Sequence, residues 1–198
     1  MTTKEKGKDD DDFDDVSSGD VCIINTIKVE RNLHQVYLNN EISSPEDYAA
    51  LLKLLRNPLE STSQIFLYLN NAGGSLSTGM QLINAIEDCT ATLICVIDAP
   101  IYSMATLLAL ACPAVMVKSK AFMMFHDFSG GFYGKSQENT AHLDAWKHEF
   151  KLLLTGVGKN FLTKKEINDI LCGKDLYIHS NEMKKRFKKL NKLVNIKY

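Results

Sequence analysis

Three short segments of this chain carry residues that can take part in acyl-transfer chemistry. Gly73–Gly74, Ser103 and His126 each follow a run of apolar and β-branched residues that predicts a strand. In α/β proteins with parallel strands, ligands bind outside the carboxyl ends of the strands, so we expect these segments to converge. A serine that passes its proton to a histidine is a nucleophile, and backbone N–H groups at a helix start can hold an oxyanion.

Each of these residues also has a purely structural explanation. Gly73–Gly74 can serve as a tight turn that needs positive φ, Ser103 as a helix N-cap, and His126 as a histidine at the edge of the core. If Ser103 is a nucleophile, the N–H of Met104 is available to an oxyanion. Asp175 follows a helix-ending glycine and can either cap the next element or orient His126. From the residue types alone, these alternatives stay open.

The elements that must position these residues alternate between strand and helix along the chain. This order predicts an α/β fold with parallel strands and right-handed crossovers. Helix N-caps are expected at Ser44 and Thr163. The expected strands are residues 21–29, 35–40, 64–70, 92–98, 114–119 and 121–128. The expected helices are residues 43–57, 75–89, 103–112, 135–160 and 163–173.

Charge is distributed unevenly along the 198 residues, although the net charge is only −1. Residues 1–20 hold eight acidic side chains and three lysines, whereas residues 184–198 hold seven Lys or Arg and no acid. We therefore expect an acidic, disordered segment over 1–20, one folded domain over 21–183 and a basic tail over 184–198.

The cysteines and histidines do not follow the spacings of metal or disulfide sites. The five cysteines are odd in number and none form a C-x-x-C pair, and there is no H-E-x-x-H motif. Reduced thiols in a cytoplasmic protein, with no metal and no cofactor, are the expectation. No apolar run reaches the roughly 18 residues of a membrane-spanning helix, and the first residues lack the apolar core of a secretory signal, so no membrane partner is expected.

Five segments between residues 33 and 182 follow one another in a familiar order. They read VYLNNEIS, FLYLNNAGGSLSTGMQLINAI, IYSMATLLAL, MMFHDFSGGFYGKSQ and KDLYIHSNE. In this order, and with these gaps, they resemble the ClpP family of serine peptidases. The resemblance implies that Ser103 is the nucleophile, that His126 is the general base and that Asp175 orients the imidazole. It also implies that the N–H groups of Gly74 and Met104 bind the oxyanion.

The resemblance further implies an architecture and partners. The fold would be the ClpP/crotonase-like spiral of ββα units, with a protruding handle made by Gly130–Gly131 and the helix 135–160. The chain would be a homo-oligomer of heptameric rings stacked as a tetradecamer. It would hydrolyse unfolded polypeptides that an AAA+ unfoldase supplies, in an ATP-dependent-type system without metal, cofactor or nucleic acid.

Several residues depart from the family's pattern and motivate alternatives. Ala99, Tyr102 and Ala105 stand where the family has glycine or another small residue, and Asp127–Phe128 replaces its Gln-Pro. Bulk near the nucleophile favours a second hypothesis, a catalytically silent ClpP-like ring subunit. A third is a crotonase-like acyl-CoA enzyme, which shares the spiral fold and a glycine-based oxyanion hole. A relative of the signal-peptide peptidases is disfavoured, because that group uses a Ser/Lys pair and a membrane anchor, and no anchor is expected here.

Overall fold

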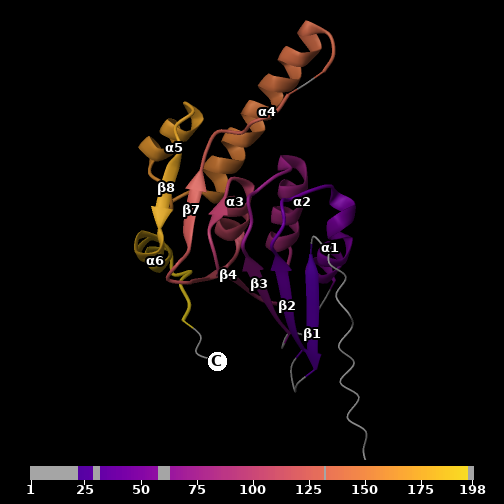
Figure 1. Cartoon of the computed structure of the whole chain (residues 1–198), viewed down its shortest axis with the longest axis vertical. Coiled ribbons are helices and arrows are strands. Elements are labelled where there is room, and N and C mark those ends of the chain that lie inside the picture. Colours follow the sequence, from indigo (N-terminus) through magenta and orange to yellow (C-terminus); the bar gives the residue numbers. More distant parts are fainter. Residues whose placement is uncertain (1–21, 29–31, 58–62, 132, 196–198) are drawn as a thin grey trace, which may run out of the picture.

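The computed structural model describes residues 22–28, 32–57, 63–131 and 133–195, and Figure 1 shows its chain. The strands are β1 (Ile23–Lys28), β2 (Asn32–Leu38), β3 (Gln64–Leu69), β4 (Thr92–Ile97), β5 (Ile101–Tyr102), β6 (Ala114–Val117), β7 (Phe122–Phe125) and β8 (Leu176–His179). The helices are the 3₁₀ helix η1 (Pro45–Tyr48) and the α-helices α1 (Ala49–Arg56), α2 (Leu76–Glu87), α3 (Met104–Ala111), α4 (Ser136–Val157), α5 (Lys164–Leu171) and α6 (Ser180–Lys189).

Two sheets organise the described chain. The larger sheet has the order β1-β2-β3-β4-β6; β1 is antiparallel to β2, and the other pairs are parallel. The smaller sheet has the order β5-β7-β8, with β5 parallel to β7 and β8 antiparallel to it. The predicted α/β class is therefore confirmed, and the parallel strands deliver their carboxyl ends to one edge.

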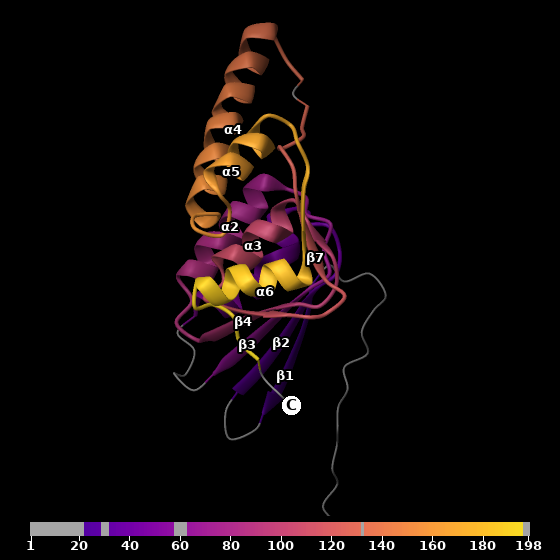
Figure 2. The ribbon, with the colours of Figure 1, turned by 90° about the vertical axis from the view of Figure 1, so that its left-hand side faces the viewer.

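The main core lies between the larger sheet and the helices α1, α2 and α3; Figure 2 shows α2 and α3 to one side of the strands. β4 has five buried residues in succession, as its continuous apolar run predicted. In α3, every residue from Met104 to Leu110 is buried. α3 is thus fixed on all sides by packing, and so is the position of Ser103, which directly precedes it.

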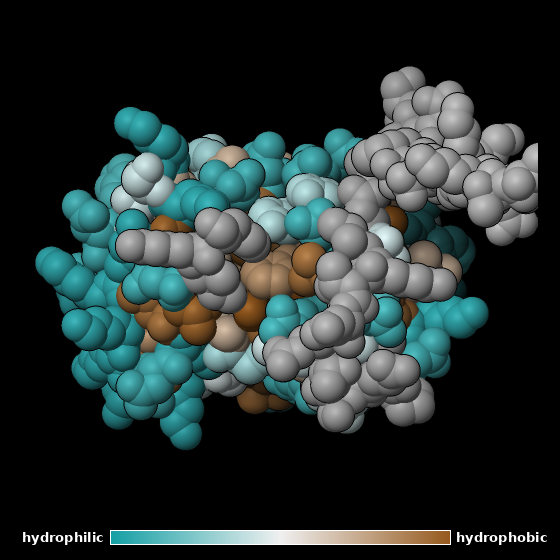
Figure 3. All heavy atoms as spheres, turned by 90° about the horizontal axis from the view of Figure 1, so that it is seen from below, coloured by the Kyte–Doolittle hydropathy of each residue, from teal (hydrophilic) through white to brown (hydrophobic). Residues whose placement is uncertain are grey.

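A smaller apolar cluster lies apart from this core. Its buried members, Phe66, Ile94, Val96 and Met116, belong to β3, β4 and β6, and no helix residue is among them. Tyr37 and Tyr68 stack beside one another with ring centroids 4.8 Å apart. Seen from below, the molecule has hydrophobic side chains in the middle of the face and hydrophilic ones around them (Figure 3). The larger sheet thus has an apolar side that its own helices leave uncovered.

α4 projects from the rest of the molecule (Figure 1). It spans 22 residues, and only Phe150 and Leu154, both in its C-terminal half, are buried. The helix expected at residues 135–160 is thereby confirmed. Its first three turns extend beyond the core.

Three elements were not predicted, and one expected boundary falls inside an element. β5, β8 and α6 have no counterpart among the expected elements. The boundary drawn between residues 183 and 184 lies within α6, where Phe187 is fully buried. The N–H of Val115 donates to the carbonyl of Lys192 at 2.7 Å, so this part of the basic segment pairs with β6. The acidic segment 1–20 lies outside the described residues.

The two expected N-caps differ in the structure. Thr163 closes a full capping box: its Oγ1 accepts from the N–H of Glu166 at 3.1 Å, and Glu166 Oε2 accepts from the N–H of Thr163 at 2.7 Å. Ser44 precedes η1 but its side chain makes no capping hydrogen bond. The N–H of Asp47 instead donates to the backbone carbonyl of Ser44 at 3.2 Å, because the first turn is a 3₁₀ turn and not an α-helical one.

Arg186 joins α6 to α5 through a half-buried ion pair. Its two terminal guanidinium nitrogens donate to the carboxylate of Glu166 at 2.8 and 3.0 Å, and one of them also donates to the carbonyl of Phe161 at 3.0 Å. Burial alone would raise the pKa of Glu166, but the hydrogen bonds from Arg186 and Thr163 outweigh it and lower that pKa below 4.5. The ionised pair therefore stabilises the fold.

Replacing Arg186 with alanine is expected to lower the free energy of unfolding by about 2–3 kcal/mol, because it leaves a half-buried carboxylate without its partner. Arg186→Lys should recover only part of this lost free energy of unfolding, since an ammonium group cannot form the paired hydrogen bonds. Because the folded pKa of Glu166 is depressed, the difference between the native and Arg186→Ala chains should be full above pH 4.5 and shrink as the pH falls. Denaturant unfolding at several pH values measures it, and a difference independent of pH would contradict the role given to Glu166.

Candidate active site

Ser103 occupies a strained position between β5 and α3. Its φ of 52° and ψ of −128° lie outside the regions that L-residues favour, which costs about 1–3 kcal/mol. Backbone hydrogen bonds hold it there: the N–H of Ser103 donates to the carbonyl of Met124 at 2.8 Å, and its carbonyl accepts from the N–H of Thr106 at 3.0 Å. Its side chain makes no capping hydrogen bond, so the N-cap explanation does not account for it.

The glycine pair lies directly against Ser103. A Cβ on Gly73, which has φ of 93°, would stand 2.6 Å from the Cβ of Ser103. A Cβ on Gly74, which has φ of 134°, would stand 2.3 Å from the carbonyl oxygen of Ile42. Both positions therefore require glycine, for its positive φ and for the close approach of the neighbouring chain.

Asn71 fixes the glycine turn, and sequence reasoning did not find it. Its Oδ1 accepts from the N–H of Gly73 at 2.8 Å, and its Nδ2 donates to the carbonyl of Asn40. The side chain is only 3% exposed, so these two bonds satisfy a buried amide. A polar residue just before a glycine pair is the signal for such a turn.

Two backbone N–H groups beside Ser103 are free within the described part of the chain. Met104 is the first residue of α3, so its N–H has no partner inside the helix. The N–H of Gly74 makes no backbone or side-chain hydrogen bond to a described residue. Both groups border the same pocket as Ser103. They can donate to an oxygen atom bound there.

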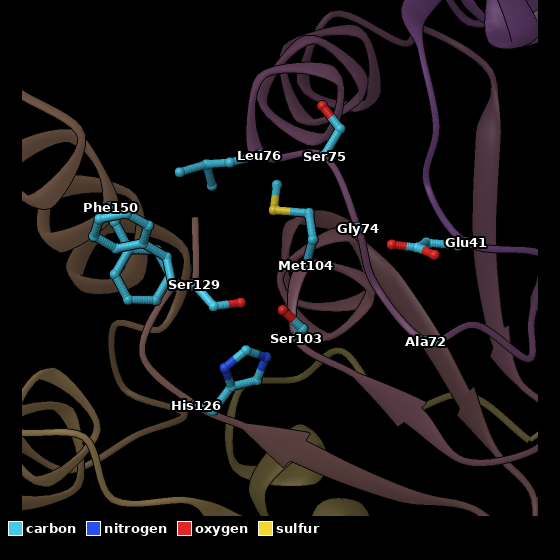
Figure 4. A pocket seen from close by; sticks show the side chains of 11 residues that line it. Glu41, Ala72, Gly74, Ser75, Leu76, Ser103, Met104, His126, Ser129 and Phe150 are labelled. Carbon is cyan, nitrogen blue, oxygen red and sulfur yellow. The ribbon is translucent and has the colours of Figure 1, made fainter. Parts of the chain in front are cut away.

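His126 and Ser103 face one another across a pocket of about 400 Å³. His126 follows the last residue of β7, and in Figure 4 its imidazole is turned toward the Ser103 hydroxyl. Among the described residues, neither side chain forms a hydrogen bond. Eleven residues line the pocket: Glu41, Ala72, Gly74, Ser75, Leu76, Ser103, Met104, His126, Phe128, Ser129 and Phe150.

Four of the five residues singled out in the sequence are therefore together, and the fifth is not. Gly74, Ser103, Met104 and His126 line the pocket. Asp175 is exposed directly before β8, is not among the lining residues, and has no hydrogen bond to His126. The expected contact between Asp175 and His126 is thus missing from this conformation of the chain.

The departures near Ser103 do not fill the pocket. Tyr102 points its ring onto Phe122, with centroids 5.5 Å apart and planes at 83°. Ala105 is fully buried in α3. The carboxylate of Asp127 accepts the N–H of Phe128 at 2.9 Å, and the Phe128 ring packs 5.8 Å from that of Phe150 on the pocket wall. Of these residues, Phe128 alone lines the pocket.

Comparison with protein families decides what kind of protein this is. The family model "Clp protease" matches residues 24–170, about three quarters of the chain. The chain belongs to the Clp protease family. Its mixed sheets and covering helices form the ClpP-like α/β fold that the resemblance implied. Comparison with curated proteins gives no match.

The Clp protease match covers most of the candidate site. Gly74, Ser103, Met104 and His126 lie inside the matched residues, whereas Asp175 lies beyond their end. Among the described residues, no group of three or more His, Cys, Asp or Glu is placed to hold a metal ion. In the same part of the chain, no helix is both long and apolar enough to cross a membrane.

Proposed function

We propose that this Clp protease family member is a serine endopeptidase in which Ser103 is the nucleophile. The observation that carries the proposal is the strained Ser103, which faces His126 in a pocket bordered by two free backbone N–H groups. A strained backbone conformation persists only where surrounding bonds hold it in place, and such residues cluster at active sites.

The reaction follows from these positions. The Ser103 hydroxyl oxygen attacks the peptide carbonyl carbon while His126 takes its proton. The carbonyl oxygen becomes an oxyanion between the N–H groups of Gly74 and Met104, and one such donor is worth about 3–4 kcal/mol. When the C–N bond breaks, His126 returns the proton to the leaving amine. Water then hydrolyses the acyl-enzyme with His126 again as the base.

Asp175 completes the proposal as the residue that orients His126, and the sequence resemblance alone supports it. Asp175 follows Gly173, whose φ is 84°, and it is exposed. Contact with His126 would therefore require residues 173–175 to shift toward the pocket. A carboxylate there would fix the imidazole tautomer and stabilise the imidazolium ion.

Family membership also supports a proposal about assembly and substrates. We propose a homo-oligomer of heptameric rings stacked as a tetradecamer, which cleaves unfolded polypeptides that an AAA+ unfoldase supplies. The protruding α4 is the element through which two rings would meet. The second candidate, a catalytically silent ring subunit, is favoured by one observation: Asp175 does not contact His126 in this conformation.

A fluorophosphonate probe separates the two candidates, since an activated serine displaces fluoride and forms a stable O–P bond. Labelling at Ser103 is expected in the native chain and in Ser119→Ala, which removes an exposed serine outside the pocket. No labelling is expected in Ser103→Ala. Peptide mapping by mass spectrometry locates the adduct. A native chain that stays unlabelled would support the silent subunit.

A further inference from the structure

The two ends of the candidate active site differ in chemistry. Leu76, Phe128 and Phe150 form an apolar wall on one side of Ser103. Glu41 lies on the other side, and Figure 4 shows Ser103 between Phe150 and Glu41. A peptide bound across Ser103 would therefore place one side chain against apolar groups and another near a carboxylate.

Glu41 is held in place by the backbone around it. The N–H of Ile42 donates to the carbonyl of Gly73 at 2.6 Å, and the N–H of Ser75 donates to the carbonyl of Ile42 at 2.7 Å. The hydroxyl of Tyr48, a fully buried residue, donates to the carbonyl of Glu41 at 3.3 Å. The side chain thus projects from a fixed backbone.

The Glu41 side chain packs against the oxyanion-binding turn. Its Cγ is 2.9 Å from the place that a Cβ on Gly74 would occupy. The Glu41 side chain therefore lies beside Gly74 and borders the pocket at this end. Glu41 is the acidic residue among those that line the pocket.

The Glu41 carboxylate has no cation of its own in the described part of the chain. Among the described residues, no Lys, Arg or His comes within 4.0 Å of it and no side chain forms a hydrogen bond with it. Its charge therefore acts on whatever enters the pocket. A cationic substrate side chain would pair with it, and an anionic one would be repelled.

We propose that Glu41 selects substrates with Lys or Arg on the leaving-group side of the scissile bond; this inference rests on the proposed peptidase function. In this proposal the acyl side of the peptide takes the apolar end, because Leu76 and Phe150, which line the pocket, can cover an apolar side chain. The leaving group then extends past Ser103 toward Glu41. Lys and Arg are long enough to bring their charge to the carboxylate from the neighbouring backbone.

Three internally quenched peptides that differ at one residue test this selection. They contain Leu-Lys, Leu-Gln or Leu-Glu in the same uncharged flanking sequence, and mass spectrometry identifies the bond cut. At low salt, kcat/KM is expected to be about fivefold higher for Leu-Lys than for Leu-Gln, and lowest for Leu-Glu. The preference should shrink as salt is added.

Glu41→Gln should bring the ratio of kcat/KM between the Leu-Lys and Leu-Gln peptides close to one. Glu46→Gln, an exposed residue of η1 outside the pocket, should keep the native ratio.

The outcomes separate this inference from the function on which it rests. An unchanged ratio in Glu41→Gln, no preference in the native chain, or cleavage with Lys on the acyl side would overturn it. If no peptide is cut, the peptidase proposal fails, and the inference is judged by fluorescence anisotropy of the same peptides with the native chain. Tighter binding of the Leu-Lys peptide that Glu41→Gln removes would then support it, and equal affinities would overturn it.

Discussion

Replacing Ser103 with alanine is expected to reduce peptide hydrolysis at least ~10³-fold, because it removes the proposed nucleophile. The backbone should not change. Alanine keeps the Cβ, and the bonds that hold φ at 52° come from the main chain of Met124 and Thr106. The rate of cleavage of a quenched peptide measures the loss, and the thermal unfolding midpoint should stay within about 2 °C of the native value.

A second substitution, at His126, tests whether the two residues act as one catalytic unit. His126→Ala should show a comparable loss, and combining it with Ser103→Ala should add little, because two members of one catalytic unit do not contribute independently. Hydrolysis at the native rate in Ser103→Ala, with the fold intact, would refute Ser103 as nucleophile. It would leave the family membership untouched.

The second large effect is expected at Gly73. Gly73→Ala should lower the free energy of unfolding by about 2–4 kcal/mol, because the residue has φ of 93° and its new Cβ would stand 2.6 Å from that of Ser103. If the chain relieves this clash by moving Ser103 by about 1 Å, fluorophosphonate labelling should slow by about 10²-fold. Denaturant unfolding measures the loss in the free energy of unfolding, and the rate of probe labelling measures the displacement of Ser103.

Gly156, a glycine with open space around it, supplies the control for Gly73. Gly156 lies in α4 without positive φ, and a Cβ there would meet no atom within 4 Å. Gly156→Ala should therefore stabilise the chain by about 0.5–1 kcal/mol through helix propensity and leave the labelling rate unchanged. Equal effects of the two substitutions would contradict the steric role of Gly73.

Much of the fold was predictable because its core elements carry strong local patterns. The continuous apolar runs at 64–70 and 92–98 are β3 and β4, and Thr163, expected as an N-cap, directly precedes α5. β5 escaped prediction because it has only two residues. α6 escaped because Met183 and Phe187 are its sole buried residues in a mostly charged segment.

The candidate site was predictable only where strand ends determine it. Gly74, Ser103 and His126 meet because parallel strands deliver them to one edge. For Asn71, the local bond to Gly73 follows a turn signal that the sequence prediction did not use, whereas the bond to Asn40, 31 residues earlier, has no local pattern. Glu41 was missed for a similar reason, since only the tertiary fold places its side chain over Gly74.

Local stability is expected to differ between the two ends of the projecting helix α4. Its C-terminal part is anchored by Phe150 and Leu154, whereas the first three turns have no buried residue. An isolated helical segment of that length is marginal in water, so these turns open without disturbing the core. In a single chain, their amide protons therefore exchange with solvent far sooner than those of β3 and β4. Any surface that packs against them would slow this exchange.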